Sequence, residues 1–255
     1  MARKEDYIAV FDSGVGGISV LRQLVRQMPG EKYLYFGDSA NAPYGTRSTE
    51  DIRQLVLKVT GQLLQKGIKA LVVACNTATS AAIDLLRQTY PQLIIVGIEP
   101  AIKLAAKQFP GGTIGVMATP VTLREEKFNH LMHQFEGSCT ILKLPVPGLP
   151  ELVEEGKGNT PETDDLLIPI LGPWQGKLDA AVLGCTHYPF ASQAIRRVLG
   201  ENTVLIDGGE GTARETRRRL QEAGLLLDGP GEVVWESSLP GTDFALRCQQ
   251  LLTQK

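Results

Sequence analysis

A repeated alternation of short apolar runs with helical periods constrains the fold of this chain more than any other feature. The first run, residues 7–11 (YIAVF), precedes a glycine-rich turn and a segment of helical periodicity, residues 18–27. Runs that are apolar throughout indicate strands buried on both faces, as in parallel sheets covered by helices. The sequence therefore predicts an α/β fold with parallel strands, in which ligands bind beyond the carboxyl ends of the strands.

The same alternation continues along the chain. Further strands are predicted at residues 33–36, 70–74, 93–98, 113–117, 140–144, 180–183 and 203–206, with a late edge strand at 233–236. Complete helices are predicted at residues 49–65, 211–223 and 243–252. Three more are predicted with one approximate end: a helix that follows CNTATS and ends at residue 90, a helix that ends at about residue 108, and a helix that begins at about residue 120. The segment 145–163, which is richer in Pro, Gly and Glu, interrupts the pattern.

Two segments about 110 residues apart resemble each other. LVVACNTAT (71–79) and AVLGCTHYP (181–189) each place a cysteine directly after a buried strand, with a threonine close by. The repetition predicts two similar α/β halves. Each half would present one cysteine, Cys75 or Cys185, to a shared cleft.

Charge and composition argue against several classes of protein. The net charge is −2 and the pI about 6.0, so no overall field attracts nucleic acid or an anionic membrane. No apolar run approaches the roughly 20 residues of a membrane helix, and no secretory signal is recognisable. We therefore expect a cytoplasmic protein with no nucleic-acid or membrane partner. The four scattered cysteines include no C-x-x-C pair, which indicates reduced thiols rather than disulfides or a zinc ribbon.

Cys75 and Cys185 are the strongest catalytic candidates. Cys75 precedes NTATS, which opens a helix, and the positive end of a helix dipole favours the thiolate form. Cys185 precedes THYP at a second strand-to-helix junction. One such cysteine alone would suit a small buried residue, but two in matched positions with polar neighbours indicate acid/base chemistry. Cys139 and Cys248 lack such neighbours and are interpreted as packing residues.

Ionisable side chains close to the two cysteines can assist them. Asp12 closes the first strand, where it could relay a proton or cap the following helix, and the residue alone favours neither role. His187 lies two residues after Cys185 and could stabilise a thiolate there or carry its proton. Glu151 and Glu154 lie in the irregular segment and could act as a further carboxylate.

The sequence predicts no cofactor and no metal. The loop DSGVGG (12–17) lacks the full dinucleotide spacing, so its N–H groups and Ser13 suit a small anion such as a carboxylate. PYGT (43–46) and NT (76–77) offer further neutral donors. None of these segments has the lysine of a pyridoxal phosphate site. His130 and His133 lack the third ligand that a zinc site needs.

Five segments, in this order, resemble the signature motifs of one family. FDSGVGG, GD-x-x-x-x-PYG, ACNTAT, LVEEG and LGCTHYP are similar to the motifs of the glutamate racemases, within the aspartate/glutamate racemase superfamily. The resemblance covers nearly the whole chain. It implies a cofactor-independent enzyme that interconverts L- and D-glutamate and supplies D-glutamate for bacterial peptidoglycan. Aspartate and hydantoin racemases share the paired cysteines, and a non-catalytic amino-acid binding protein is the alternative from another class.

The resemblance also implies roles for individual residues. The implied catalytic residues are Cys75, Cys185, Asp12, His187 and Glu154, with Glu151 as the alternative to Glu154. The implied substrate-binding residues are Asp12, Ser13, Tyr44, Gly45, Asn76, Thr77, Thr186 and His187, and Thr119 and Thr122 lie in a further matching stretch. Cys75 is expected to deprotonate the D-enantiomer and Cys185 the L-enantiomer.

The family's architecture supplies the remaining expectations. It implies two flavodoxin-like α/β domains, residues 1–98 with 211–255 and residues 99–210, with the active site in the cleft between them. It also implies a homodimer.

Overall fold

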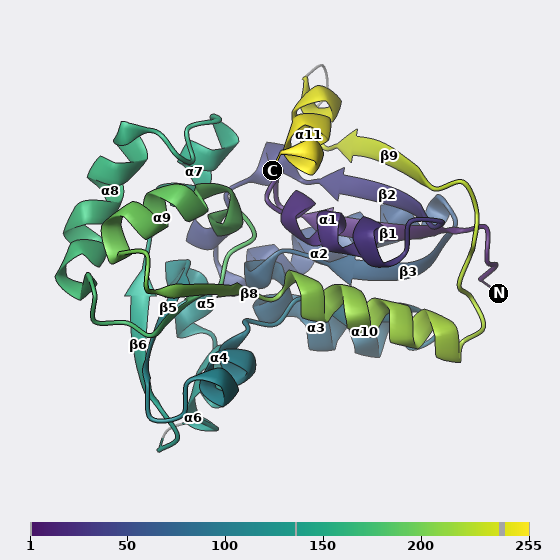
Figure 1. Cartoon of the computed structure of the whole chain (residues 1–255). Helices are drawn as coiled ribbons and strands as arrows, with labels where there is room; N and C mark the ends of the chain where they lie inside the picture. The colour runs from purple at the N-terminus through teal and green to yellow at the C-terminus, as the bar shows by residue number, and fades with distance from the viewer. Residues whose placement is uncertain (1, 136, 240–242, 255) are drawn as a thin grey trace. The chain divides into compact units, whose positions relative to one another are not determined.

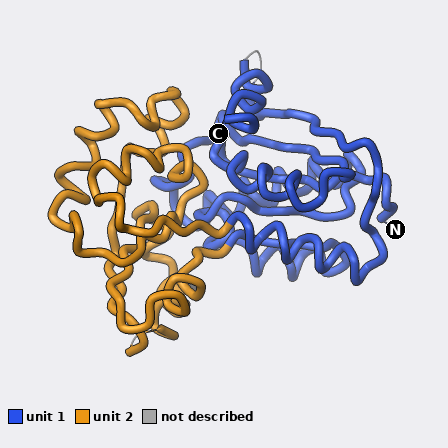
Figure 2. The backbone as a smooth tube through the Cα atoms, viewed as in Figure 1, with its two compact units in different colours: residues 1–98, 209–255 blue, residues 99–208 orange. Residues whose placement is uncertain are grey.

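The computed structural model describes residues 2–135, 137–239 and 243–254. The chain forms two compact units, shown in different colours in Figure 2: residues 1–98 with 209–255 form unit 1, and residues 99–208 form unit 2. Unit 1 is thus built from two separate parts of the sequence, and unit 2 is one continuous segment between them. Each unit has its own parallel sheet with helices packed around it (Figure 1).

Unit 1 contains a five-stranded sheet in the order β4-β3-β1-β2-β9, in which every neighbouring pair is parallel. Its strands are β1 (Tyr7–Asp12), β2 (Lys32–Gly37), β3 (Ile68–Val73), β4 (Ile94–Gly97) and β9 (Glu232–Ser237). Its helices are α1 (Ile18–Gln27), α2 (Thr49–Gln65), α3 (Asn76–Thr89), α10 (Gly209–Glu222) and α11 (Phe244–Thr253), with the 3-10 turns η1 (Ser39–Asn41) and η2 (Tyr44–Thr46). β9 lies at the edge of the sheet, as the sequence predicted.

Unit 2 contains a four-stranded parallel sheet in the order β6-β5-β7-β8. Its strands are β5 (Thr113–Ala118), β6 (Thr140–Pro145), β7 (Ala180–Leu183) and β8 (Val204–Asp207). Its helices are α4 (Ile102–Gln108), α5 (Pro120–Arg124), α6 (Glu126–His133), α7 (Leu149–Glu154), α8 (Pro161–Leu171) and α9 (Ser192–Leu199), with the 3-10 turns η3 (Gly172–Trp174) and η4 (Tyr188–Ala191).

The two sheets share one strand order. When the first four strands of each unit are numbered in sequence, both sheets follow 2-1-3-4, which is the order of flavodoxin-like sheets. In unit 1, β9 extends the sheet beyond its second strand. The predicted α/β fold with two similar, flavodoxin-like parallel sheets is therefore confirmed. The sequence repeat around the two cysteines falls on β3 and β7, the third strand of each unit.

Local sequence explains the start of α2, the division between α5 and α6, and the buried face of α1. Ser48 caps α2 by accepting the N–H of Asp51, because its side-chain oxygen replaces a partner that the first helical turn lacks. The helix predicted from residue 120 is divided at Glu125, whose extended backbone separates α5 from α6. In α1, Leu21 and Leu24 are fully buried, and each contributes about 1.5–3 kcal/mol through burial.

The segment 145–163 is more regular than its composition indicated. It contains α7, and α8 begins inside it at Pro161. Pro150 and Pro161 both lie in the first turn of a helix, where a residue without an N–H loses no hydrogen bond. Gly148 precedes α7 with a φ of 84°, which a glycine adopts without strain. Two of the prolines in this segment therefore mark the starts of helices.

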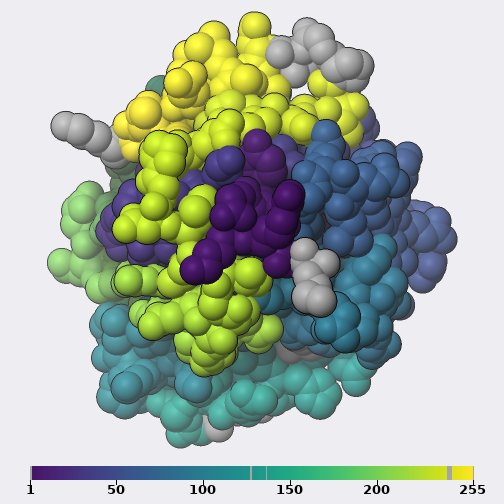
Figure 3. Space-filling model, turned by 90° about the vertical axis from the view of Figure 1, so that its right-hand side faces the viewer, coloured from purple at the N-terminus to yellow at the C-terminus, as the bar shows by residue number. Residues whose placement is uncertain are grey.

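A fully buried ion pair ties segments of unit 1 together at the amino ends of the strands. Lys69 Nζ donates to Glu31 Oε2 at 2.6 Å, and both side chains are wholly shielded from solvent. The same Nζ donates to the carbonyls of Lys4 and Leu225, so all three of its donors are used. Glu31 Oε1 accepts the N–H of Leu227. The pair thus joins the starts of β2 and β3 to the N-terminal residues and to the chain after α10. In Figure 3, the N-terminal residues and the chain after α10 lie side by side on the surface.

We expect Lys69→Met to lower the free energy of unfolding by about 3–5 kcal/mol, because it leaves the carboxylate of Glu31 buried without its partner. The double variant Lys69→Met/Glu31→Gln should recover part of that loss, since no charge remains buried. Chemical denaturation followed by circular dichroism gives both values. Equal losses in the single and double variants would contradict this account of the pair.

Candidate active site

Several of the polar side chains that the sequence singled out follow the first and third strands of each unit. In unit 1, Asp12 ends β1 and Cys75 follows β3, and these two strands are neighbours in the sheet. In unit 2, Thr119 follows β5 and Cys185 follows β7, which are also neighbours. Sheets with this order bind ligands at the carboxyl ends of the first and third strands, where the winding of the chain changes direction. Each unit therefore presents a cysteine at its topological switch point.

Cys75 is the N-cap residue of α3. Its Sγ accepts the N–H of Ala78 at 3.4 Å and lies 3.7 Å from Ser13 Oγ. Only 5% of the residue surface is exposed. The helix N-terminus predicted at this cysteine is confirmed. The N–H of Ala78 and the dipole of α3 both favour a negative charge on the sulfur.

Asp12 is fully buried at the end of β1. Its Oδ1 accepts the N–H of Gly14 at 3.0 Å, which shapes the turn after the strand. α1 begins further along, with Gly17 as its N-cap and without a side-chain cap, so the interpretation of Asp12 as a helix cap is wrong. Gly17 packs directly against Asp12, because a Cβ at residue 17 would lie 2.7 Å from the Cβ of Asp12. A glycine is needed for this close approach.

Asn76, the first residue of α3, has a buried and unsatisfied amide. The residue is 4% exposed, and neither its Oδ1 nor its Nδ2 has a hydrogen-bond partner. Leaving a buried polar group unpaired costs about 1–3 kcal/mol, so such groups in folded proteins call for an explanation. An amide of this kind beside a candidate catalytic thiol suits a polar ligand that completes its hydrogen bonds. The adjacent Thr77 is also buried.

Tyr44 and Gly45 lie in the turn η2, where the side chain of Tyr44 contacts Asp38. The Tyr44 hydroxyl donates to Asp38 Oδ2 at 2.6 Å, and Asn41 Nδ2 donates to the same carboxylate. Burial raises the pKa of Tyr44, and the bond to Asp38 adds to this effect, so the hydroxyl stays protonated. Asp38 was not predicted to have a role, although it lies directly after β2 and within the GD-x-x-x-x-PYG segment. Asp38 holds the turn that carries Tyr44 and Gly45.

Cys185 belongs to a chain of three ionisable side chains within unit 2. Its Sγ lies 3.7 Å from His187 Nδ1, and His187 Nε2 lies 2.8 Å from Glu154 Oε1. Cys185 and His187 are buried, whereas one third of the Glu154 side chain is exposed. The carboxylate in contact with His187 is that of Glu154, at the end of α7. Glu151 lies about one turn earlier on the same helix.

The imidazole of His187 has a strongly perturbed pKa. Burial lowers the pKa of His187, but the hydrogen bonds with Cys185 and Glu154 and the negative charges of these groups outweigh burial. The pKa of His187 therefore lies well above its ordinary value of about 6.5. The imidazolium form is favoured, with an acceptor at each ring nitrogen. A thiolate at Cys185 gains a cationic neighbour from this arrangement.

Three threonines of unit 2 are buried close to the same strand ends: Thr119, Thr122 and Thr186. Thr186 lies between Cys185 and His187 in the sequence. The hydroxyl oxygens of Thr119 and Thr122 are 3.0 Å apart, and Thr119 Oγ1 also accepts the N–H of Thr122 as the cap of α5. Unit 2 thus supplies hydroxyl groups as well as ionisable groups at this edge of its sheet.

All four cysteines are free thiols. Cys139 is half-buried just before β6, and Cys248 is fully buried inside α11. Neither of these two lies at a topological switch point, which agrees with their interpretation as packing residues.

Two features are absent from the described part of the chain. None of its described helices is long and apolar enough to cross a membrane. Among the described residues, no group of three or more His, Cys, Asp or Glu side chains is arranged to hold a metal ion.

Comparison with known proteins gives one consistent family. Residues 8–216 match the family described as Asp/Glu/Hydantoin racemase. The glutamate racemase of Clostridium novyi (strain NT) is 47% identical over 248 residues, which cover 96% of this chain and 96% of that protein.

Solved structures show the same similarity in three dimensions. A glutamate racemase isoform from Bacillus anthracis matches with a TM-score of 0.88 and 32% identity, covering 99% of this chain and 96% of that chain. Escherichia coli glutamate racemase, solved in complex with L-glutamate and the activator UDP-MurNAc-Ala, matches with a TM-score of 0.83 and 32% identity, covering 96% of this chain and 95% of that chain.

We expect Glu154→Gln to lower the pKa of His187 towards its ordinary value, because the change removes a negative charge at Nε2. Because the pKa is raised in the folded protein, the stability from this contact is full below about pH 6.5 and is lost as the pH rises through the folded value. NMR titration of the imidazole signals measures the shift. Glu151→Gln is the matched control and should leave the His187 titration nearly unchanged. A His187 that titrates at or below its ordinary value in the unaltered protein would refute this description.

Proposed function

Because this chain belongs to the Asp/Glu/hydantoin racemase family and is an amino-acid racemase, we propose that it interconverts L- and D-glutamate by proton transfer between the substrate and two cysteine thiols. No cofactor takes part in the proposed reaction. Glutamate is favoured as the substrate because the relatives that match over most of the chain are glutamate racemases.

The chemistry of the α-carbon explains why two thiols are needed. The α-proton of a free amino acid is very weakly acidic, and turnover of about 10 s⁻¹ requires a barrier of roughly 16 kcal/mol. A single base would have to move from one face of the carbon to the other. Two groups on opposite faces avoid this movement, since one thiolate removes the proton while the opposite thiol donates one.

The observation that carries the proposal is the equivalent placement of Cys75 and Cys185. Each follows the third strand of a parallel sheet of the same order, at the point where such sheets bind ligands. Each sulfur also has an independent reason to carry negative charge. Cys75 accepts an N–H at the start of α3, and Cys185 lies beside the imidazole of His187.

In the proposed reaction, the two thiols exchange roles in every turnover. With D-glutamate, the Cys75 thiolate removes the α-proton and the Cys185 thiol donates a proton to the opposite face. Cys75 is then a thiol and Cys185 a thiolate, which is the state that accepts L-glutamate. Asp12 assists Cys75, while His187 and Glu154 stabilise the charge that forms on Cys185.

Neutral donors and two ionisable side chains are proposed to hold the charged groups of the substrate. The proposed binding residues are Asp12, Ser13, Tyr44, Gly45, Asn76, Thr77, Thr186 and His187, and Thr119 and Thr122 lie in a further stretch that matches the family. Among them, the buried amide of Asn76 has unused donors and an unused acceptor, and it suits a substrate with both carboxylate and ammonium groups. Donors fixed before the substrate arrives stabilise the charge that develops as the α-proton leaves.

The biological setting of the enzyme is also a proposal. We propose two domains, residues 1–98 with 211–255 and residues 99–210, and an active site formed by residues of both. We further propose a cytoplasmic homodimer whose D-glutamate is used for peptidoglycan. The family resemblance supports these statements.

Incubation in deuterium oxide tests the proposed function. Without added cofactor, we expect L-glutamate to racemise with uptake of deuterium at the α-carbon, because the donated proton comes from a solvent-exchanged thiol. L-aspartate should remain essentially unchanged. Polarimetry and NMR follow the two effects. Comparable racemisation of aspartate would exclude glutamate specificity, and racemisation without deuterium uptake would exclude the proposed proton transfers.

The same measurement on serine variants of the protein distinguishes the roles of the two thiols. Cys75→Ser should block α-deuterium uptake from D-glutamate, and Cys185→Ser should block it from L-glutamate. Cys139→Ser is the matched control and should keep both exchanges. If the two active-site variants behave identically towards both enantiomers, the two-sided mechanism is wrong.

Asn76→Ala should separate binding from stability. We expect kcat/KM for glutamate to fall about 10- to 100-fold, because hydrogen bonds to charged groups contribute about 1.5–3 kcal/mol. The free energy of unfolding should not decrease, since the variant removes a buried amide that has no partner in the folded chain. Gln88→Ala, on the exposed part of α3, serves as the control. A clear loss of stability with unchanged kcat/KM would show that the amide is structural.

A further inference from the structure

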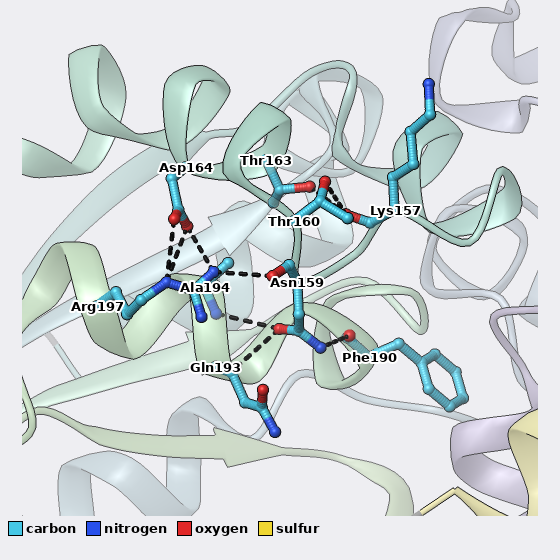
Figure 4. Close-up of polar contacts among 9 residues, drawn as sticks. All are labelled: Lys157, Asn159, Thr160, Thr163, Asp164, Phe190, Gln193, Ala194 and Arg197. Carbon is cyan, nitrogen blue, oxygen red and sulfur yellow. Dashed lines mark hydrogen bonds and ion pairs between the residues drawn. The ribbon is translucent and has the colours of Figure 1, made fainter.

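The loop between α7 and α8 makes a group of polar contacts that the proposed function does not use (Figure 4). The loop joins two helices that pack beside the chain after β7, since α7 contacts η4 and α8 contacts α9. Asn159 lies at the centre of the group. Both ends of its side-chain amide bind the backbone of the segment that begins with Cys185.

Asn159 provides the cap of α9 from a distant part of the chain. The N-cap residue of α9 is Ala191, which has no side-chain oxygen to offer. Asn159 Oδ1 instead accepts the N–H groups of Gln193 and Ala194, at 3.1 Å each. These are the two N–H groups that a local N-cap side chain would satisfy. The start of α9 is therefore fixed by the α7–α8 loop.

The other end of the amide fixes η4. Asn159 Nδ2 donates to the carbonyl of Phe190 at 2.7 Å, and the N–H of Phe190 donates to the carbonyl of His187 at 3.0 Å. The contact between Glu154 and His187 joins the same two chain segments a few residues earlier. The two segments are thus linked twice, once by the ionisable pair and once by Asn159.

The loop is itself held rigidly around Asn159. The carbonyl of Asn159 accepts Arg197 Nη2, and the Arg197 guanidinium forms a bidentate pair with Asp164. Thr163, which is fully buried, donates to the carbonyl of Lys157 at 2.6 Å. Gly158 permits the close approach to η4, because a Cβ there would lie 2.8 Å from the carbonyl oxygen of Phe190.

We propose that Asn159 is a positioning residue for the acid/base group formed by Cys185, His187 and Glu154. It holds η4, which directly follows the thiol and the imidazole in the chain, at a fixed distance from the end of α7, which carries the carboxylate. The inference rests on the proposed two-thiol function and assigns a positioning role on the Cys185 side of the reaction. A displacement of about 1 Å at a reacting group can reduce a rate about 100-fold, so small errors in this distance affect catalysis.

Asn159→Asp is the sharpest variant for a test. Aspartate keeps the oxygen that caps α9, but it replaces the donor to Phe190 with an oxygen that faces the carbonyl. We expect kcat/KM to fall about tenfold or more while α9 remains capped. Gly158→Ala removes no hydrogen-bonding group and should act in the same way by pushing the loop away from η4. Asp165→Asn is the matched control, because it removes a charge from an exposed side chain of α8 and leaves the hydrogen bonds of Asn159 in place.

Isotope effects identify which thiol is affected. The equilibrium constant between enantiomers is one, so kcat/KM of any variant falls by the same factor in both directions. If proton transfer at Cys185 is slowed, however, this step limits the rate of racemisation in both directions. Substrates with deuterium at the α-carbon detect the change. The isotope effect on kcat/KM should then rise for the enantiomer that Cys185 deprotonates and fall for the other. A merely structural role would move neither value.

Divergent isotope effects in Asn159→Asp and Gly158→Ala, with unchanged values in Asp165→Asn, would support the proposal. A folded Asn159→Asp protein that keeps kcat/KM within about twofold would overturn it, and so would a loss of activity with unchanged isotope effects. Failure of the underlying function would be seen separately, as a lack of racemisation or of α-deuterium uptake in the unaltered protein.

Discussion

Parallel pairing of the first and third strands is the constraint on which the candidate groups of each unit depend. β1 pairs with β3 and β5 with β7, so the carboxyl ends of each pair meet at one edge of a sheet. In both units the backbone bonds continue past the strands. Ala74 donates its N–H to the carbonyl of Phe11, and Gly184 donates its N–H to the carbonyl of Met117. The ladder thus reaches the residue before each cysteine, which gives the two thiols matching positions.

The two sulfurs nevertheless interact with different kinds of neighbouring group. Cys75 is a helix cap, and its sulfur accepts a backbone N–H at the positive end of a helix dipole. Cys185 precedes a short 3-10 turn, and a side chain, His187, supports it in place of a long helix. A dipole does not titrate, whereas an imidazolium does. The favourable neighbour of Cys185 therefore depends on the protonation state of His187, whereas the helix dipole at Cys75 does not change with pH.

Buried polar groups at the two ends of the unit 1 sheet differ in their hydrogen bonding. At the amino ends of the strands, Lys69 and Glu31 are wholly buried but use their hydrogen-bonding groups on each other and on nearby backbone. At the carboxyl ends, the amide of Asn76 is buried without any partner. A protein keeps an unpaired buried amide at a cost of about 1–3 kcal/mol, and such costs are typical of sites that are completed by a ligand. The buried ion pair and the amide at the candidate site thus differ in how completely their hydrogen-bonding groups are used.

The sequence by itself determined the parallel α/β fold, nearly every strand and the position of Cys75 at a helix start, because apolar runs and strand–helix junctions are local patterns. It left open whether Asp12 caps a helix and whether Glu151 or Glu154 approaches His187, and it gave no role to Asp38 or Asn159. The tertiary structure decided these points. Asn159 binds residues more than 30 positions away, and the choice between two glutamates on one helix depends on which face of α7 meets the turn after β7. Contacts of this kind depend on packing between distant segments, for which a single sequence contains no periodic signal.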